Sequence, residues 1–377
     1  METVSLSEFR PAPWLPGPHA QTLWGPLARR LRSVPFLRER VGTPDGDELV
    51  LDHLEGRQDA PRLLVLHGLE GSSFSFYVQG LLSLASRLGW RATVLNFRSC
   101  ARDPQRPGRW IENLRPRLYH SGETEDLSHV ASLLAARDGG RPLLALGVSL
   151  GGNALLKWLG ENPAQRLVAA AAVISVPFDL AAGARHLETV AGSLYVRHFL
   201  ATLLPKARSL ARRFPEAGER LDLARLSRAR TFFEFDDAGT APLHGFAGAE
   251  DYWERSSSLK ALGAISVPVL AISSEDDPFL PPEALWRARS AGSSSVVFEV
   301  SSRGGHAGFV SGSSPLGSRA WAEETAVAWL WHRAPGTGHR APGPGTGSGQ
   351  LFLPSRVQID RISMRTRRSC RTLRRRI

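Results

Sequence analysis

The sequence has few of the features that mark secreted or membrane-spanning proteins. It contains two cysteines in 377 residues, Cys100 and Cys370, too few for a disulfide framework, so we expect free thiols and a cytoplasmic location. The N-terminal segment lacks a basic region followed by an apolar core, which argues against a secretory signal. No run approaches the roughly 18 apolar residues that a membrane span requires, although peripheral contact with a membrane is compatible with the sequence.

Motifs for metals and cofactors are also missing. His and Cys do not cluster at the spacing of metal ligands, and the carboxylates are scattered. Neither G-x-x-x-x-G-K-[ST] nor a dinucleotide-binding glycine motif occurs. We therefore expect no metal and no cofactor.

The net charge of +11 would suggest a nucleic-acid partner if it were spread over the whole chain. Instead, residues 334–377 hold ten Arg and one Asp, which leaves a net charge of +2 for the rest. Because this segment is also rich in Pro and Gly, we interpret it as a disordered tail. Arginine runs are most often solvated tails, so we expect no nucleic-acid partner.

Short apolar runs alternate with helical patterns between residues 40 and 333, which is typical of the α/β class with a mainly parallel central sheet flanked by helices. The predicted strands are 63–67, 92–97, 143–148, 168–175, 269–273 and 296–300. The predicted helices are 74–88, ending at Gly89, 123–137, 150–159, ending at Gly160, and 320–332.

We expect three parts in the chain: an N-terminal extension packed on the core (1–40), the α/β domain (41–333) and the tail (334–377). From about 180 to 258 the alternation gives way to helical and aromatic stretches. This pattern predicts a helical cap insertion over the carboxyl edge of the sheet, where ligands bind in open α/β sheets.

The clearest chemical signal is a G-x-S-x-G motif, Gly147 to Gly151, at a predicted strand-to-helix turn around Ser149. The motif alone is weak evidence for a nucleophilic serine. Its position at a strand-to-helix turn makes the evidence strong, because such a turn presents the serine hydroxyl above the sheet at a helix N-terminus. The N–H of Leu150 is then placed to bind a developing oxyanion. Leu69, in the loop 67–71, is the candidate for the second donor, although that loop could also be an ordinary strand-ending turn.

A nucleophilic serine needs a base, and a histidine oriented by a carboxylate is the usual one. His306 is the candidate because it follows the last predicted strand in a Gly-rich loop. Asp276 and Asp277 follow the strand before it, which gives the order Ser, Asp, His. We favour Asp277, because the prolines after it shape the departing loop, and Asp276 would then stabilise that loop.

With these residues in place, the chain resembles the YheT-like family of α/β-hydrolases from about Pro13 to Trp331. The motifs that carry the resemblance are Pro18–Thr22, His67–Gly71, Asn96–Arg98, Leu118–Gly122, Thr240–Phe246 and Gly304–Phe309. The resemblance implies that Ser149, Asp277 and His306 match the family's charge-relay positions. Two features depart from the family pattern: Ser99 stands where Gly is common, and the tail is foreign to it.

These observations predict a serine hydrolase of carboxylic esters, similar to esterases and lipases, that acts through an acyl-enzyme and takes small-molecule ester or lipid substrates. The alternative is a non-catalytic α/β-hydrolase scaffold that binds lipid or a protein partner, because fold alone does not imply catalysis. The complete set of nucleophile, acid and base favours the enzyme. Acyl chain length, natural substrate and oligomeric state are not determined by the sequence.

Overall fold

The computed structural model describes residues 8–29 and 32–334. The predictions for the Arg-rich tail and for Cys370 lie outside these residues, apart from Ala334 at the tail's start. Cys100 is a buried free thiol.

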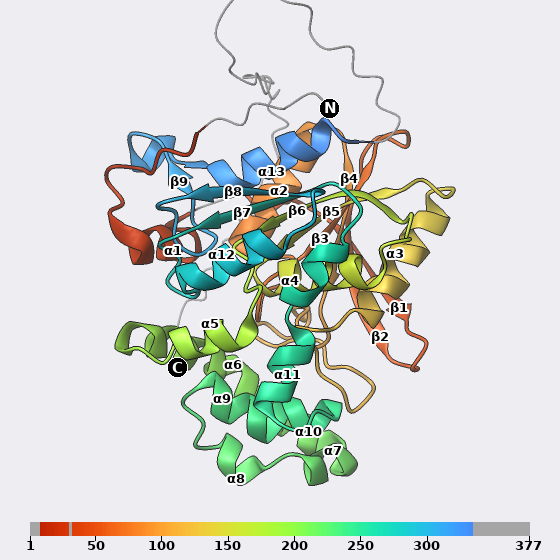
Figure 1. The fold of residues 1–377 in the computed structure, drawn as a ribbon. Helices are drawn as coiled ribbons and strands as arrows, with labels where there is room; N and C mark the ends of the chain where they lie inside the picture. Colours follow the sequence, from red (N-terminus) through yellow and green to blue (C-terminus); the bar gives the residue numbers. More distant parts are fainter. Residues whose placement is uncertain (1–7, 30–31, 335–377) are drawn as a thin grey trace, which may run out of the picture. The chain divides into compact units, whose positions relative to one another are not determined.

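An eight-stranded sheet forms the centre of the fold, in the order β1-β2-β4-β3-β5-β6-β7-β8 (Figure 1). Its strands are β1 Leu37–Gly42, β2 Glu48–Leu54, β3 Arg62–Leu66, β4 Arg91–Asn96, β5 Leu143–Val148, β6 Val168–Ile174, β7 Val269–Ser274 and β8 Val296–Ser301. From β4 to β8 all neighbours are parallel, whereas β2 is antiparallel to both β1 and β4. A separate antiparallel pair joins β9 Val310–Ser311 to β10 Arg319–Ala320.

Helices cover both faces of the sheet. On one face α13 (Trp321–Trp331) packs against α2 (Phe76–Arg87), and α1 (Gly17–Ala28) contacts α2. The other face carries α3 (Glu125–Arg137), α4 (Leu150–Glu161) and α12 (Pro282–Ala291). Residues 63–66 of β3 and all of β5 are continuous apolar runs and are fully buried, as central strands covered on both sides must be.

The six predicted strands match β3 to β8, and the four predicted helices match α2, α3, α4 and α13, each within two residues. The prediction that the helix beginning at residue 150 ends at Gly160 is wrong. α4 continues through Gly160 to Glu161, and a Cβ at Gly160 would lie 2.2 Å from the carbonyl oxygen of Ala261. Gly160 is therefore required for close packing and does not end the helix.

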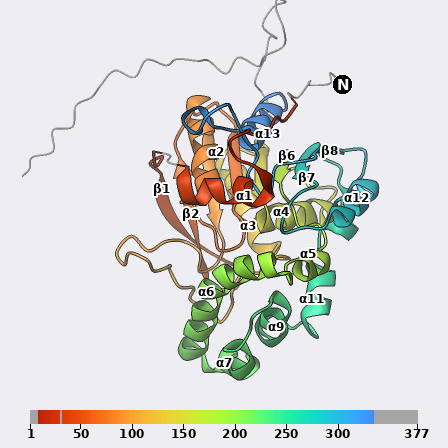
Figure 2. The same cartoon turned by 90° about the vertical axis from the view of Figure 1, so that its left-hand side faces the viewer.

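The segment between β6 and β7 is a helical insertion, residues 180–256, which lies at the carboxyl end of the parallel strands (Figures 1 and 2). Its α-helices are α5 Leu180–His186, α6 Val190–Arg213, α7 Pro215–Arg220, α8 Leu223–Leu226, α9 Phe232–Phe235, α10 Ala241–His244 and α11 Ala249–Ser256, with a π-helical turn at Asp236–Thr240. A 3₁₀ turn at Leu259–Ala264 leads into β7, and another lies at Pro315–Gly317. The insertion has an apolar core of its own, formed by α6 and the short helices that follow.

Candidate active site

Ser149 lies in a strained turn between β5 and α4. Its φ of 53° and ψ of −122° place a non-glycine residue in a sparsely populated region. A Cβ at Gly147 would lie 2.6 Å from the carbonyl oxygen of Gly151, and a Cβ at Gly151 would lie 2.5 Å from that of His67. The two glycines are thus needed for a turn this tight.

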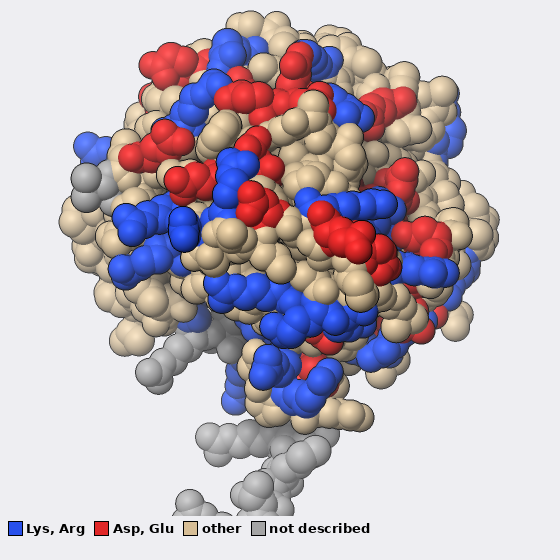
Figure 3. Space-filling model, turned by 90° about the horizontal axis from the view of Figure 1, so that it is seen from below, with Lys and Arg blue, Asp and Glu red and all other residues tan. Residues whose placement is uncertain are grey.

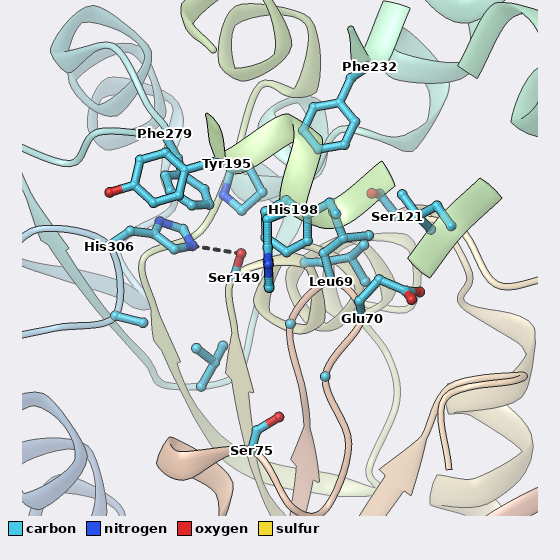
Figure 4. Close-up of a pocket in the computed structure, with 18 of the residues that line it drawn as sticks. Leu69, Glu70, Ser75, Ser121, Ser149, Tyr195, His198, Phe232, Phe279 and His306 are labelled. Atoms are coloured by element: carbon cyan, nitrogen blue, oxygen red, sulfur yellow. Dashed lines mark hydrogen bonds between the residues drawn. The ribbon is translucent and has the colours of Figure 1, made fainter. Parts of the chain in front are cut away.

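Ser149, His306 and Asp277 form a continuous chain of hydrogen bonds, in which the bond between Ser149 and His306 is the dashed line in Figure 4. The Ser149 Oγ lies 2.9 Å from Nε2 of His306. Nδ1 of His306 lies 2.8 Å and 3.1 Å from the two carboxylate oxygens of Asp277. Since the carboxylate only accepts, Nδ1–H donates, and Nε2 is left to accept from the serine hydroxyl. Asp276 instead accepts the backbone N–H of Gly305 at 2.9 Å, which stabilises the loop that bears His306.

Phe279 and two residues of α1 hold His306 and its loop in place. The Phe279 ring stacks on the imidazole, with centroids 4.1 Å apart. The hydroxyl of Thr22 accepts the backbone N–H of His306 at 2.9 Å. The side-chain amide of Gln21 donates to the carbonyl of Val310 and accepts its N–H. The motif Pro18–Thr22 therefore stabilises the loop between β8 and β9 through these hydrogen bonds.

The loop after β3 presents Leu69 opposite His306, across Ser149 (Figure 4). The N–H groups on either side of Leu69 are occupied by tyrosine hydroxyls: Gly68 donates to Tyr77 and Glu70 donates to Tyr119, each at 2.8 Å. Leu150, the other predicted donor, is the first residue of α4, where a backbone N–H has no partner within the helix. The loop geometry thus leaves the N–H groups of Leu69 and Leu150 as the candidates for an oxyanion site.

His67 supports this loop and lies behind it. Its Nδ1–H donates to the carbonyl of Gly68 at 2.7 Å, and its Nε2 accepts the N–H of Phe97 at 3.1 Å. Burial lowers the pKa of His67 to about 4. The imidazole is therefore neutral near pH 7, and its two hydrogen bonds specify its tautomer.

Ser149 opens into a cavity of about 1160 Å³ that is lined by α1, the loop after β3 and the helical insertion. The wall contributed by the insertion is mostly apolar and includes Leu180, Ala184, Leu194, Phe199, Leu203, Leu221, Phe232, Phe235 and Leu243. Another part of the wall carries the rings of His120 and His244, whose centroids are 4.6 Å apart. Burial lowers the pKa of His120 to about 3 and that of His244 well below its usual value, so this part offers polar groups without charge.

Several residues in this arrangement had no role assigned from the sequence. Gln21, Tyr119, His120 and His244 lie in the motifs of the resemblance, which was the only signal for them. Lys206 had no signal at all, because a lone Lys in a helical pattern is normally a solvated residue.

Within residues 8–29 and 32–334, no group of three or more His, Cys, Asp or Glu side chains is arranged to hold a metal ion. In the same part of the chain, no helix is both long enough and apolar enough to cross a membrane.

The sheet order, the strained turn after β5 and the position of the insertion are those of an α/β-hydrolase. The family described as "alpha/beta hydrolase fold" matches residues 61–313. The chain therefore belongs to the α/β-hydrolase fold family, and the fold class predicted from the sequence is confirmed.

Within the α/β-hydrolase fold family, the chain is similar to YheT-like proteins. YheT of Escherichia coli (strain K12) is 36% identical over 333 residues, covering 87% of this chain and 94% of YheT, which confirms the resemblance to YheT-like proteins. Phospholipase ABHD3 of Mus musculus is 30% identical over 320 residues, covering 83% of this chain and 75% of the mouse protein. Among solved structures, DcsB in complex with its substrate analogue has a TM-score of 0.51 at 14% identity, covering 80% of this chain and 100% of DcsB, a likeness of fold alone.

Proposed function

We propose that this chain is a serine hydrolase that cleaves carboxylic esters through an acyl-enzyme. The observation that carries the proposal is the chain of hydrogen bonds from Ser149 through His306 to Asp277, located at the wall of a large cavity. A surface serine would not need a base and a buried carboxylate aligned behind it.

In the proposed mechanism, Oγ of Ser149 attacks the ester carbonyl while Nε2 of His306 takes its proton. The N–H groups of Leu69 and Leu150 bind the oxyanion. His306 then passes the proton to the leaving alcohol, and a water molecule activated by the same imidazole releases the acid and regenerates Ser149. Asp277 holds the imidazole in the required tautomer and stabilises its cation.

The cavity supports an apolar acyl group as the substrate's main feature. We propose that the helical insertion serves as a cap that forms the acyl pocket, because its contribution to the wall is mostly leucine and phenylalanine. The relative named as a phospholipase supports esters of lipids over charged metabolites.

Labelling with a fluorophosphonate probe tests the proposal. We expect the native protein to be labelled, Ser149→Ala to be unlabelled and His306→Ala to be labelled much more slowly. Ser121→Ala is the matched control, since Ser121 also lines the cavity but makes no hydrogen bond to His306. Hydrolysis of p-nitrophenyl esters of increasing chain length then measures the acyl preference.

An unlabelled but folded native protein would contradict the proposal. It would favour the alternative, a non-catalytic scaffold that binds lipid or a protein partner in the same cavity.

A further inference from the structure

Large apolar side chains are concentrated at the mouth of the cavity. Leu27 is 78% exposed, Leu194 is 61% exposed and Phe74 is 50% exposed, yet all three line the cavity, as does the more shielded Leu23. A side chain that lines a cavity and is also widely exposed must lie at its opening. These four make up more than a third of the eleven exposed large apolar side chains in the described residues. Exposed apolar side chains gathered around one cavity mark an interaction surface, unlike apolar residues scattered singly.

The rim formed by Leu23, Leu27, Phe74 and Leu194 brings together segments that are distant in the sequence. Leu23 and Leu27 belong to α1, Phe74 precedes α2, and Leu194 belongs to α6 of the helical insertion. α1 and α6 lie on the side of the molecule that faces the reader in Figure 2. His19 of α1 and Tyr195 of α6 join the two helices, with Nδ1 2.9 Å from the tyrosine hydroxyl.

Helix α6 carries unpaired positive charge that begins beside Leu194 of the rim and continues along the helix. Arg197, Arg208 and Arg212 lie on the face of α6 that carries Leu194, because steps of 3, 11 and 4 residues return to one side of an α-helix. All three are exposed, and none forms an ion pair within the described residues. From Arg197 to Arg230 the chain has nine Lys or Arg against three Asp or Glu. Seen from below, Lys and Arg form a broad band over the lower half of the view (Figure 3).

We propose that the rim and the arginine stripe (Arg197, Arg208 and Arg212) dock the protein on a bilayer that contains anionic phospholipid. The rim side chains enter the boundary between headgroups and acyl chains, and the arginines bind the phosphates around it. Apolar insertion and cationic attraction reinforce each other in binding of this kind, and neither is strong alone. An apolar protein partner would not need the unpaired arginines, which is why an anionic lipid surface is the occupant that fits both features.

Docking in this orientation deepens the proposed function, because the mouth of the cavity would open onto the lipid surface. A lipid ester could then enter towards Ser149 without crossing water. This consequence depends on the proposed function, whereas docking itself does not.

The test uses the full chain with Ser149→Ala, so that binding is measured without turnover. Binding is followed by flotation with vesicles of phosphatidylcholine alone and of phosphatidylcholine with a quarter phosphatidylglycerol. We expect binding to the second kind, and at least a tenfold loss of partitioning in the variant Leu27→Ser, Phe74→Ser, Leu194→Ser. The variant Arg197→Gln, Arg208→Gln, Arg212→Gln should lose about tenfold at low salt and less as salt screens the charges.

A local probe separates the rim from the rest of the chain, which includes the ten C-terminal arginines. In a Cys370→Ser background, Leu194→Cys is labelled with an environment-sensitive dye, and Leu223→Cys, exposed but outside the cavity lining, is the control. We expect a blue shift on anionic vesicles at position 194 and none at 223. Vesicle binding without that shift, binding unchanged in the rim variant, no binding at all, or a rim-dependent dimer in sedimentation would each overturn the proposal.

Docking and catalysis can fail separately. Fluorophosphonate labelling of the native protein without vesicle binding would leave the hydrolase proposal intact, and vesicle binding by a protein that is never labelled would leave the docking surface intact.

Discussion

Lys206 of the helical insertion and Glu70 of the loop after β3 form a buried ion pair with an N–O distance of 2.6 Å. Their side chains are 5% and 8% exposed. The same carboxylate accepts the hydroxyl of Tyr119, which in turn accepts the backbone N–H of Glu70. Lys206 therefore connects the insertion to the backbone beside Leu69, so it is placed to act as a positioning residue for the proposed oxyanion site.

Replacing Lys206 by Met should leave the carboxylate of Glu70 buried without its partner. Removing one member of a buried ion pair destabilises by about 3–5 kcal/mol, so we expect a loss of that size in urea unfolding. If the loop shifts, kcat on a soluble ester should fall about 10- to 100-fold with a smaller change in KM.

The matched control for that experiment is Lys260→Met, which breaks an exposed pair with Glu254 of the same length, 2.6 Å. We expect a loss below about 1 kcal/mol there. Adding Glu70→Gln to Lys206→Met should recover part of the stability. Equal losses in the two lysine variants would show that the buried pair has no special role.

The two adjacent aspartates should differ sharply in their effect on catalysis. Asp277→Asn removes the carboxylate that holds Nδ1 of His306, and we expect kcat to fall about 10³- to 10⁴-fold. Asp276→Asn keeps an acceptor for the N–H of Gly305, and its kcat should stay within about tenfold of the native value. Steady-state kinetics on a p-nitrophenyl ester measures both, and a reversed order would assign the acid to Asp276.

Gly151, two residues after Ser149, should tolerate no side chain. In Gly151→Ala the new Cβ would lie 2.5 Å from the carbonyl oxygen of His67 and 2.6 Å from that of Leu66, both backbone atoms that cannot move alone. We expect a loss of about 3 kcal/mol or more in urea unfolding. Gly42→Ala is the control, because a Cβ at Gly42 meets no described atom within 4 Å. Similar stability of the two variants would mean that β3 and α4 can separate.

Asp236 should make the protein less stable as the pH rises from about 4 to about 6. Burial raises the pKa of its carboxyl to about 6 from 3.8, although Thr240 and Trp253 donate hydrogen bonds to it. Between these values the folded protein binds a proton that the unfolded chain has released, so stability falls with pH in this window and is level above it. The expected change is on the order of 2–3 kcal/mol.

Asp236→Asn measures that contribution directly, since an amide keeps a hydrogen-bonding group at each position. In urea unfolding at pH 7 the variant should have a larger free energy of unfolding than the native protein. This difference should shrink towards pH 4. A difference that does not vary with pH would show that folding does not raise the pKa of Asp236.

Patterns within a few residues were enough to predict β3 to β8. Residues 63–66 and 143–148 are continuous apolar stretches, as expected of strands in a sheet that is covered on both faces. β3 and β5 lie within one residue of the predicted strands 63–67 and 143–148. The turn at Ser149 was predictable for the same reason, because the glycines that permit it lie two residues away on either side.

Elements without that local signal were not predicted. β1 is an edge strand in which half of the residues are charged and all but Val41 are at least partly exposed, so no apolar run marks it. α12 begins at Pro282, whereas the prolines after Asp277 predict a loop there. Proline is accepted in the first turn of a helix, because the N–H it lacks has no partner there. Ser99, the departure from the family pattern, adopts a φ of 59°, a conformation that glycine reaches without strain.

The sequence by itself thus determined the fold class, the strained turn and the order of Ser149, the aspartates and His306. Only the tertiary structure decided which partners meet. Asp277 reaches His306 because β7 and β8 are parallel neighbours that end together, while Asp276 turns to the backbone. Gln21 and Val310 are 289 residues apart, and Lys206 and Glu70 are 136 apart. No period or motif links such pairs, because a hydrogen bond or an ion pair depends on distance in space, and the packing of the whole sheet and its insertion sets that distance.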